Sequence, residues 1–392
     1  MKTIHLIPYM HPSAGGPPVV ADRFCRHLVA LGWEAEIITS NSYARNEDLS
    51  WVDDYEAPYQ MTVLPSVGPQ GFGYSSSLGK TLEDKIASAD VVHIHNLWSY
   101  FNFTGSRICQ RNKVPYVVST HGMLDPNSLS RKSWKKTVYG NLIEWPRLRN
   151  ASGMIYTHPE EQRLAETQCD GLPSGFVVPL ASDPPPNIER EVLKGEFLKS
   201  FPELENSKRI VFLGRLHSKK GLDLLIPAMA KIREEVDNVV LVLVGPCEEN
   251  YLAELKHLAK SSGVEDVCKF VGPRSGKDKW AALAAADLFA LPSYQENFAI
   301  ALVEALSVGT PAVISKRINI WEEIEDAKAG VLTELSQNGV ADACLSLLRD
   351  EDLVTRTGQA AKRFAENQYS WSRSALELDS IYRSLAARGA TS

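Results

Sequence analysis

The stretch that decides the fold lies in the second half of the chain, where residues 287–315 read DLFALPSYQENFAIALVEALSVGTPAVIS. A short apolar run comes first, followed by a Pro-Ser corner, a polar segment and an apolar run of helical periodicity that stops at Gly309. A second apolar run, 311–315, closes the stretch. This order predicts a buried strand, a helix and another buried strand, the building unit of a parallel, doubly wound α/β sheet.

Two carboxylates, Glu296 and Glu304, frame the start of the predicted helix. If both were helical, eight steps of about 1.5 Å would separate their backbones by about 12 Å, whereas the carboxylates of a glycoside hydrolase lie roughly 5 to 9.5 Å apart. Free backbone N–H groups near Asn297, Phe298 and Ala299 lie between the two carboxylates and favour the binding of an anion there. This order of carboxylate, anion site and carboxylate predicts a site that binds a sugar, a diphosphate and a ribose in turn. The alternative is an ordinary amphipathic helix with solvated Glu residues.

This Glu-x7-Glu pattern, beginning with Glu296-Asn297-Phe298, resembles the signature of the retaining glycosyltransferases of family 4. The resemblance implies the GT-B fold, in which two doubly wound Rossmann-like domains face a deep inter-domain cleft and a C-terminal helix returns to the first domain. It also implies transfer of a sugar from a nucleotide diphosphate sugar, expected to be a UDP-hexose, to a hydroxyl of a lipid-linked saccharide in polysaccharide biosynthesis. Glu296 would then contact the sugar and Glu304 the ribose.

The length of the chain requires more than one core, because 392 residues exceed the size of a single comfortable domain. The strongest boundary signal is the Pro-rich segment 179–187. We therefore expect a first, acceptor-side domain over 1–182 and a hinge over 183–208. A nucleotide-sugar-binding domain over 209–370 and a helix over 371–392 complete the predicted chain.

The composition is that of an ordinary globular protein, with 44% hydrophobic and 23% charged residues and a formal net charge of −6, and it gives no sign of a nucleic-acid partner. The N-terminal apolar run is too short for a signal peptide, and no window of about 18 apolar residues occurs, so we expect a cytoplasmic protein. The 6 cysteines form no Cys-x-x-Cys pair, which indicates reduced thiols.

A glycine pair follows the first apolar run of the chain. The order of a strand over 4–7, a Gly- and Pro-rich loop and an amphipathic helix places Gly15 and Gly16 where the backbone can approach a phosphate. Such a pair is often simply a turn. In the family that the chain resembles, a glycine loop at this point faces the donor phosphates.

Polar residues follow two later strands of the first half, predicted over 91–95 and 116–120. Ligands bind at the carboxyl ends of such strands, although a single His is more often a packed residue. His93 alternates with His95, so one of the two is expected to face the other side of the sheet as a packed residue. The resemblance places His121 near the transferred sugar. The candidates for the acceptor cleft are His95, Asn96, Trp98 and Tyr100.

The first strand of the second half runs into a glycine-bearing turn with two cations, Arg215 and Lys220, and with Lys219 as a rival for the second. An Arg fork and a Lys point charge suit a diphosphate, and the sequence is not a Walker A loop. The segment resembles the one that holds the donor phosphates in the family. By the same resemblance, the candidates beside the donor at the ends of the next two strands are Gly245, Pro273 and Arg274.

A basic stretch, 131–149, holds six Lys and Arg residues against one acid, Glu144, with Trp134 and Trp145 among them. Basic helices edged with aromatic residues bind anionic lipid at the membrane interface. We therefore expect peripheral contact with the inner face of the cell membrane. A docked helix with a solvated basic face explains the stretch equally well.

No metal is expected. The Asp-x-Asp sequence at Asp350 and Asp352 is predicted to cap a helix, and no His and Cys set has the spacing of a zinc site. Two other functions stay open. A nucleotide-sugar epimerase of GT-B architecture would need an acid and base pair, of which only His121 is evident. A non-catalytic nucleotide-sugar-binding protein would need Glu304 but neither His121 nor the phosphate cations.

Overall fold

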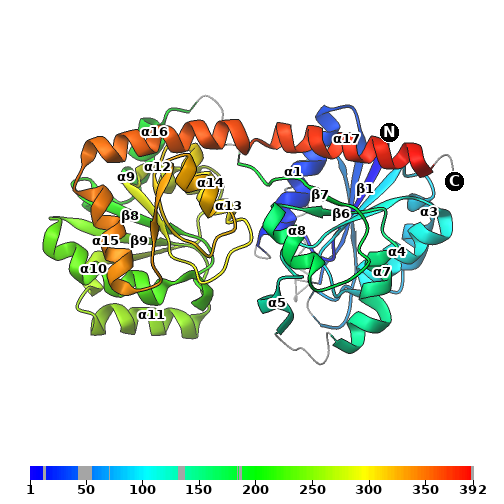
Figure 1. Cartoon of the computed structure of the whole chain (residues 1–392), viewed down its shortest axis with the longest axis horizontal. Coiled ribbons are helices and arrows are strands. Elements are labelled where there is room, and N and C mark those ends of the chain that lie inside the picture. Colours follow the sequence, from blue (N-terminus) through cyan, green and yellow to red (C-terminus); the bar gives the residue numbers. More distant parts are fainter. Residues whose placement is uncertain are drawn as a thin grey trace. The chain divides into compact units, whose positions relative to one another are not determined.

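The computed structural model describes residues 1–11, 15–42, 55–69, 71–130, 137–182, 184 and 188–389. The chain forms two compact units. One comprises Met1–Leu180 together with Trp371–Ser392, and the other comprises Ala181–Ser370. The segment 183–208, expected as a hinge, belongs to the second unit, and its described part contains a helix, α9 (Arg190–Ser200). The C-terminal helix belongs to the first unit, as its red ribbon beside α1 in Figure 1 shows.

The first unit is built on a seven-stranded parallel sheet of order β3-β2-β1-β4-β5-β6-β7. Its strands are β1 (Lys2–Leu6), β2 (Glu34–Ser40), β3 (Gln60–Leu64), β4 (Val91–His95), β5 (Tyr116–Ser119), β6 (Gly153–Tyr156) and β7 (Gly175–Val177). Its helices are α1 (Gly16–Ala30), α3 (Leu78–Ile86), α4 (Tyr100–Asn112), α5 (Pro126–Ser130), the π-helix η2 (Gly140–Glu144), α7 (Trp145–Arg149), α8 (Pro159–Glu166) and α17 (Trp371–Gly389).

The second unit is built on a six-stranded parallel sheet of order β10-β9-β8-β11-β12-β13. Its strands are β8 (Lys208–Leu213), β9 (Val239–Val244), β10 (Cys268–Gly272), β11 (Leu288–Leu291), β12 (Ala312–Ser315) and β13 (Gly330–Thr333). Its α-helices are α9, α10 (Leu222–Glu235), α11 (Glu249–Ser261), α12 (Gly276–Ala285), α13 (Ile300–Ser307), α14 (Trp321–Asp326), α15 (Gln337–Leu348) and α16 (Glu351–Gln368). Short 3₁₀ turns are η3 (Pro202–Leu204), η4 (Ser218–Lys220) and η5 (Glu265–Val267).

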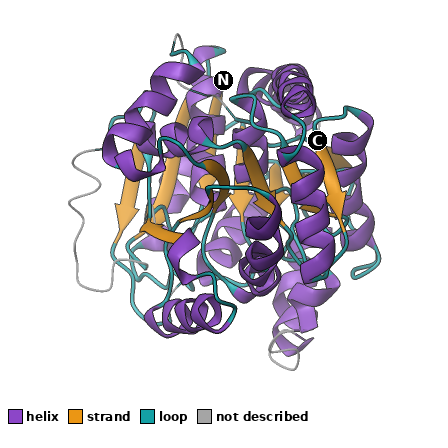
Figure 2. Cartoon of the chain, turned by 90° about the vertical axis from the view of Figure 1, so that its left-hand side faces the viewer, coloured by secondary structure: helices purple, strands orange, loops and turns teal. Residues whose placement is uncertain are grey.

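Both sheets have the doubly wound order, and helices cover the strands on both sides (Figure 2). The strand order reverses between β1 and β4 in the first unit and between β8 and β11 in the second. Ligands of such folds bind beyond the carboxyl ends of the strands at this reversal. The predicted α/β fold class is confirmed, and the reversals show where in each unit to look for a site.

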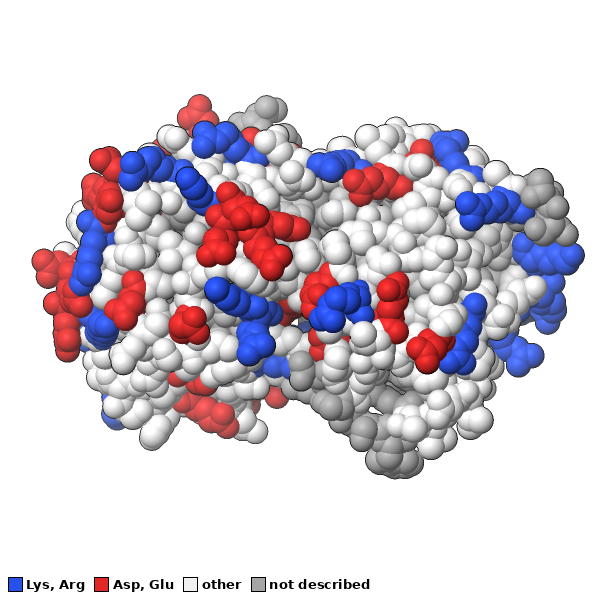
Figure 3. All heavy atoms as spheres, in the orientation of Figure 1, with Lys and Arg blue, Asp and Glu red and all other residues white. Residues whose placement is uncertain are grey.

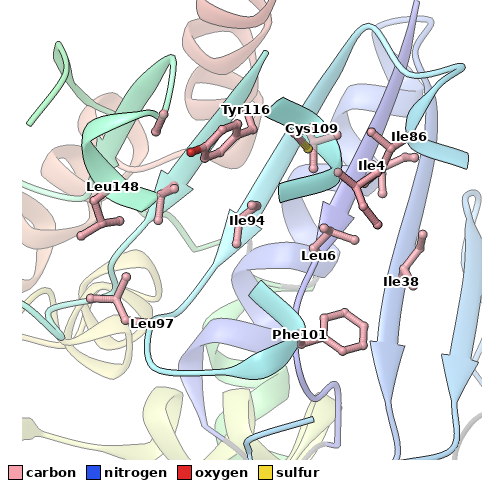
Figure 4. Close-up of a cluster of buried hydrophobic side chains, with 14 of the residues drawn as sticks. Ile4, Leu6, Ile38, Ile86, Ile94, Leu97, Phe101, Cys109, Tyr116 and Leu148 are labelled. Carbon is pink, nitrogen blue, oxygen red and sulfur yellow. The ribbon is translucent and has the colours of Figure 1, made fainter. Parts of the chain in front are cut away.

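One hydrophobic cluster of the first unit lies on one face of its sheet, where side chains of β1, β4 and α4 point toward one another (Figure 4). Ile4, Leu6, Ile94 and Phe101 are fully buried there. Gly105 of α4 sets the distance between this helix and the sheet, because a Cβ there would lie 2.3 Å from Leu6 Cδ1. The close packing holds the loop that joins β4 to α4 against the sheet.

One expectation about the first sheet is wrong. His93 lies on the same face as His95, and their ring centroids are 4.1 Å apart. Residues two positions apart on a strand share a face, because successive side chains alternate. The two short strands β6 and β7 were also not predicted.

Candidate functional site

In the second unit, glycines bring the strand-end loops together. A Cβ on Gly245, at φ 145°, would lie 1.9 Å from the carbonyl oxygen of Gly214, so the loops after β8 and β9 touch through backbone. A Cβ on Gly221, at φ 70°, would lie 2.0 Å from the carbonyl oxygen of Pro292. Only glycine permits this approach and this positive φ. The turn with the predicted cations is therefore held against the corner after β11.

This packing brings Lys220 to Glu296. The Lys220 ammonium forms an ion pair with Glu296 Oε1, to which Ser293 Oγ also donates a hydrogen bond of 3.2 Å. The backbone N–H of Glu296 donates to the carbonyl of Arg317 at 3.0 Å. Glu296 is therefore fixed in a loop, and the condition that both carboxylates are helical is not met, since α13 begins at Ile300.

The other two cations of the turn have different surroundings. The ammonium of Lys219 donates to Gln295 Oε1 at 3.0 Å, while Lys220 holds the carboxylate one residue further on. Arg215 is exposed and forms no ion pair with any residue that the structure describes. Its guanidinium is thus available to a phosphate, and Lys220 lies in the same turn.

Glu304 lies on α13 and is largely buried. Its carboxylate is ion-paired with Lys279 of α12, whose ammonium also lies 4.8 Å from the centroid of the Trp280 ring. The sequence pattern did not predict Lys279 as a partner, because the two residues are 25 positions apart on different helices. The Lys279 partner compensates the burial of the carboxylate and fixes its direction.

The start of α13 supplies backbone donors between the two carboxylates. Ala299 occupies the N-cap at φ 60° with no side-chain cap, and within the described chain the N–H groups of Phe298, Ala299 and Ile300 have no acceptor. Phe298 is buried, and its ring packs edge-on against the Tyr369 ring with the two centroids 5.2 Å apart. Only its backbone can therefore face a ligand. Asn319 Nδ2 donates to Asn297 Oδ1 at 3.2 Å. These unpaired donors and the helix dipole favour an anion.

The remaining donor candidates lie after β10 and before α1. Pro273 is exposed, and the Arg274 guanidinium stacks 5.5 Å from the centroid of the Phe201 ring. In the first unit, Gly15, at φ 94°, is the uncapped N-cap of α1, and Gly16 is the first residue of that helix. The two prolines that follow have no N–H, so this helix start offers fewer donors than the start of α13.

His121 lies just beyond β5 in a left-handed turn, with φ 49°, and Gly122 follows with φ 73°. The buried carboxylate of Glu161 holds this turn: Oε1 accepts from Thr120 Oγ1 at 2.7 Å and from the Gly122 N–H at 2.6 Å. Oε2 accepts from the N–H and the hydroxyl of Thr157. Burial lowers the pKa of His121 to about 4, although Glu161 opposes the shift, so the ring is neutral at pH 7.

The structure places His95, which was expected in the acceptor cleft, in the interior of the first unit. It is fully buried, and its two ring nitrogens are joined to His5 at 3.0 Å and to His121 at 3.1 Å. Both of its polar atoms are therefore used inside the unit, and the side chain supports His121 instead of reaching a ligand.

The other three acceptor candidates share the β4–α4 loop. Asn96 and Trp98 have φ of 70° and 64°, a conformation that costs energy in residues with a side chain. Asn102 Nδ2 holds the loop by donating to the carbonyls of His95 and Asn96 at 2.8 Å each. The buried amide of Asn96 has no partner among the described residues. Such strain and an unpartnered amide are typical of a ligand-binding loop, and partly exposed Tyr100 begins the helix that follows.

The basic stretch divides into two parts. Residues 131–136, with four of its six cations, lie outside the described residues. Arg147 was expected on a solvated basic face. Its side chain is instead 3% exposed and forms an ion pair with fully buried Glu144. Leu142 is 74% exposed on η2. Acidic and basic side chains are interspersed over the face in Figure 3. Among the described helices, none is long and apolar enough to cross a membrane.

The two metal expectations have separate outcomes. Asp350 caps α16, with Oδ1 accepting from the Leu353 N–H at 2.9 Å, which confirms the capping prediction. For the second expectation, the structure contains a cluster of histidines that the sequence did not reveal. Ring nitrogens of His5, His93 and His95 all lie within 4.8 Å of one another in the first unit. Spacing along the chain could not show this cluster, because β1 and β4 meet only in the sheet.

Two family models match the chain. The model of the glycosyl transferases group 1 matches residues 194–364, and the model of the glycosyl transferase 4-like domain matches residues 15–180. Among curated proteins, D-inositol 3-phosphate glycosyltransferase of Corynebacterium aurimucosum is 27% identical over 403 residues, covering 97% of this chain and 94% of the relative. Phosphatidyl-myo-inositol mannosyltransferase of Mycobacterium leprae is 31% identical over 195 residues, covering 49% of this chain and 50% of the relative.

Solved structures show the same fold. Anabaena HepE in complex with UDP and glucose has a TM-score of 0.78 at 20% identity, covering 98% of this chain and all of the other. Sucrose-phosphate synthase from Thermosynechococcus elongatus has a TM-score of 0.77 at 19% identity, covering 99% of this chain and all of the other. At these identities the likeness concerns the fold alone.

Proposed function

Since the chain belongs to the glycosyltransferases of the GT-B, family 4 type, we propose that it transfers a hexose from a UDP-linked donor to a hydroxyl group, with retention at the anomeric carbon and without a metal ion. The observation that carries this proposal is the arrangement at the strand reversal of the second unit. Arg215 and Lys220, an uncapped helix start and two separately held carboxylates all lie in that region, and these are the groups that a nucleotide sugar would need.

The cations and the helix start would bind the diphosphate. Arg215 is available as a bidentate fork, and Lys220 has three N–H donors, so it can hold Glu296 and a phosphate oxygen together. As the bond between the sugar and the phosphate breaks, negative charge grows on the departing phosphate. Fixed cations stabilise that charge more in the transition state than in the ground state. Phosphate charge is thus met by protein groups, which supports transfer without a metal.

The two carboxylates and His121 would orient the rest of the donor. Glu304, held by Lys279, accepts hydrogen bonds from the ribose hydroxyls, and Glu296 accepts one from the sugar. His121 faces the transferred sugar by the family resemblance. In a front-face substitution, the acceptor oxygen bonds to the anomeric carbon on the side that the phosphate leaves, and the acceptor proton passes to that phosphate.

Two acceptor classes are tested together. The basic stretch favours a lipid-linked saccharide at an anionic surface. The similarity to D-inositol 3-phosphate glycosyltransferases favours an inositol phosphate as a second candidate. Both place the reacting hydroxyl beside negative charge, and the strained loop at Asn96 and Trp98 is the proposed contact for the acceptor.

The test is a panel of UDP-, GDP- and ADP-sugars incubated with inositol 3-phosphate or with a lipid-linked saccharide, with and without EDTA. We expect acceptor-dependent release of UDP, unaffected by EDTA, and a product whose anomeric proton coupling matches that of the donor. Activity that EDTA removes and Mg²⁺ restores would contradict metal independence. Conversion of the donor to its isomer without an acceptor would indicate an epimerase, and binding without turnover would indicate a sensor.

A further inference from the structure

A chain of hydrogen-bonded side chains runs through the interior of the first unit and ends at His121. Its members are polar groups of three adjacent strands, of the turn after β5 and of the C-terminal helix, and all but His121 are buried. In order they are Ser119, His93, Tyr382, His5, His95 and His121.

Each link joins one ring nitrogen to the next group. The Tyr382 hydroxyl lies 2.5 Å from His93 Nδ1 and 3.3 Å from His5 Nε2. His5 Nδ1 lies 3.0 Å from His95 Nε2, and His95 Nδ1 lies 3.1 Å from His121 Nε2. His93 Nε2 closes the other end on Ser119 Oγ at 2.7 Å.

The four imidazoles are neutral at pH 7. Burial lowers the pKa of His5 to about 3 and that of His121 to about 4, and it also lowers the pKa values of His93 and His95. A neutral imidazole has one N–H donor and one acceptor nitrogen. A ring that donates on one side must therefore accept on the other, so the tautomers along the chain cannot be chosen separately.

The distances at Tyr382 favour one of the two possible directions, in which His93 Nε2–H donates to Ser119 Oγ at 2.7 Å, the short end of the N–H range. Bonds donated by a hydroxyl are shorter than bonds donated by an N–H. The 2.5 Å link indicates that the Tyr382 hydroxyl donates to His93, and the 3.3 Å link indicates that His5 Nε2–H donates to the Tyr382 oxygen. His5 Nδ1 then accepts from His95 Nε2–H, and His95 Nδ1 accepts from His121 Nε2–H.

We propose that this chain fixes His121 as the Nε2–H tautomer, so that its Nδ1 presents a lone pair to a hydroxyl of the transferred sugar. His5, His95 and Tyr382 are then positioning residues, because they act through His121. The sugar contact rests on the proposed function, whereas the tautomer does not. Nδ1 of His121 has no partner among the described residues, so it is the atom left for a ligand.

A metal ion bound by His5, His93 and His95 is the competing explanation for this cluster. All six ring nitrogens of these residues are already engaged in the hydrogen bonds above. The cluster is fully buried and consists of histidines alone, so a bound dication would keep its full charge in the interior. The hydrogen-bonded chain satisfies every nitrogen without that cost.

The tautomers are read directly by two-bond proton–nitrogen correlation NMR of the protein labelled with ¹⁵N-histidine, at pH 7. Signals are assigned from their loss in single His→Gln variants. We expect His121 as one Nε2–H tautomer in the wild type and a mixture of both tautomers in Tyr382→Phe. The matched control is Tyr156→Phe, since Tyr156 is equally buried in the same unit and its hydroxyl has no partner among the described residues.

Kinetics provide the second measurement. Tyr382→Phe should lower kcat by about tenfold while the KM for the donor changes less than twofold, and Tyr156→Phe should match the wild type. An unchanged His121 tautomer in Tyr382→Phe would overturn the proposal. One equivalent of zinc in the purified protein, whose removal shifts the three histidine signals, would also overturn it. If no sugar donor is turned over, the proposed function fails while the NMR result still decides the tautomer.

Discussion

Lys220 forms an ion pair with Glu296, 76 residues further along the chain, across the strand reversal of the second unit. The pair joins the two motifs that the sequence had assigned to different parts of the donor, the phosphate and the sugar. An ammonium with three donors can serve both at once, so the pair couples recognition of the sugar to stabilisation of the leaving group.

The first prediction concerns the phosphate clamp. Lys220→Ala and Arg215→Ala should each remove about 2 to 4 kcal/mol of transition-state stabilisation, the effect of losing one preorganised electrostatic donor. The measurement is kcat/KM with saturating acceptor. Lys231→Ala is the matched control, because Lys231 lies in the same unit but pairs with Asp342 at the surface. A change below about threefold in both clamp variants would show that the phosphates bind elsewhere.

The second prediction separates the two carboxylates. Glu304→Ala should weaken the binding of free UDP by isothermal titration, because the ribose loses its acceptor, and Glu296→Ala should mainly lower kcat. Lys279→Ala tests the same site through the ion-pair partner of Glu304. It removes the ion-pair partner that holds the buried Glu304 carboxylate in place, so it should also weaken UDP binding. UDP binding as tight as that of the wild type in Glu304→Ala would show that the ribose lies elsewhere.

Much of the fold follows from the sequence because the strands are continuous apolar runs between glycine or proline turns. The strand 91–95 was predicted to the residue, and Gly309 ends the α13 region with φ 77°. The short strands β6 and β7 were not predicted.

The candidate site was only partly predictable. Strand ends carry the motif residues, and a turn glycine such as Gly221 marks a close approach. The partners that fix these residues come from other elements: Lys279 for Glu304, Glu161 for the turn at His121, and Tyr382 for the buried imidazoles. No local pattern predicts such pairs, since they exist only after the sheet and its helices have formed.

The third prediction is acid instability of the first unit. The folded state keeps its four clustered imidazoles neutral, whereas in the unfolded chain each titrates near pH 6.5. Their stabilisation is therefore fully present above about pH 6.5. It falls as the pH decreases toward the lowered folded-state pKa values, by up to about 1.4 kcal/mol per pH unit for each histidine. Glu161 opposes the lowering of the His121 pKa and so reduces the contribution of His121 to this pH dependence.

Urea unfolding at several values between pH 7 and pH 5 measures this slope. His5→Gln should reduce the slope of the unfolding free energy against pH by the equivalent of about one bound proton. The control His257→Gln changes an exposed imidazole on α11 and should leave the slope as it is in the wild type. Equal slopes in all three proteins would show that His5 is not held neutral by the fold.

The last prediction concerns the basic stretch. Its cations would each contribute about 1 kcal/mol near an anionic surface, and exposed Leu142 could enter the headgroup layer, whereas Arg147 is committed to Glu144. Binding should require anionic lipid and weaken with salt, because the Debye length shrinks from about 10 Å at 0.1 M to about 3 Å at 1 M. The measurement is co-sedimentation with neutral and anionic vesicles.

The test compares the wild type with a variant in which Lys132, Lys135 and Lys136 are changed to Glu. A matched variant makes the same charge change on exposed lysines of the second unit, Lys256, Lys260 and Lys277. Only the first variant should lose vesicle binding if the position of the charge matters. Equal loss in both would mean that binding follows net charge alone. If no protein pellets with anionic vesicles, the stretch is a solvated face, and a soluble acceptor such as an inositol phosphate becomes the favoured substrate.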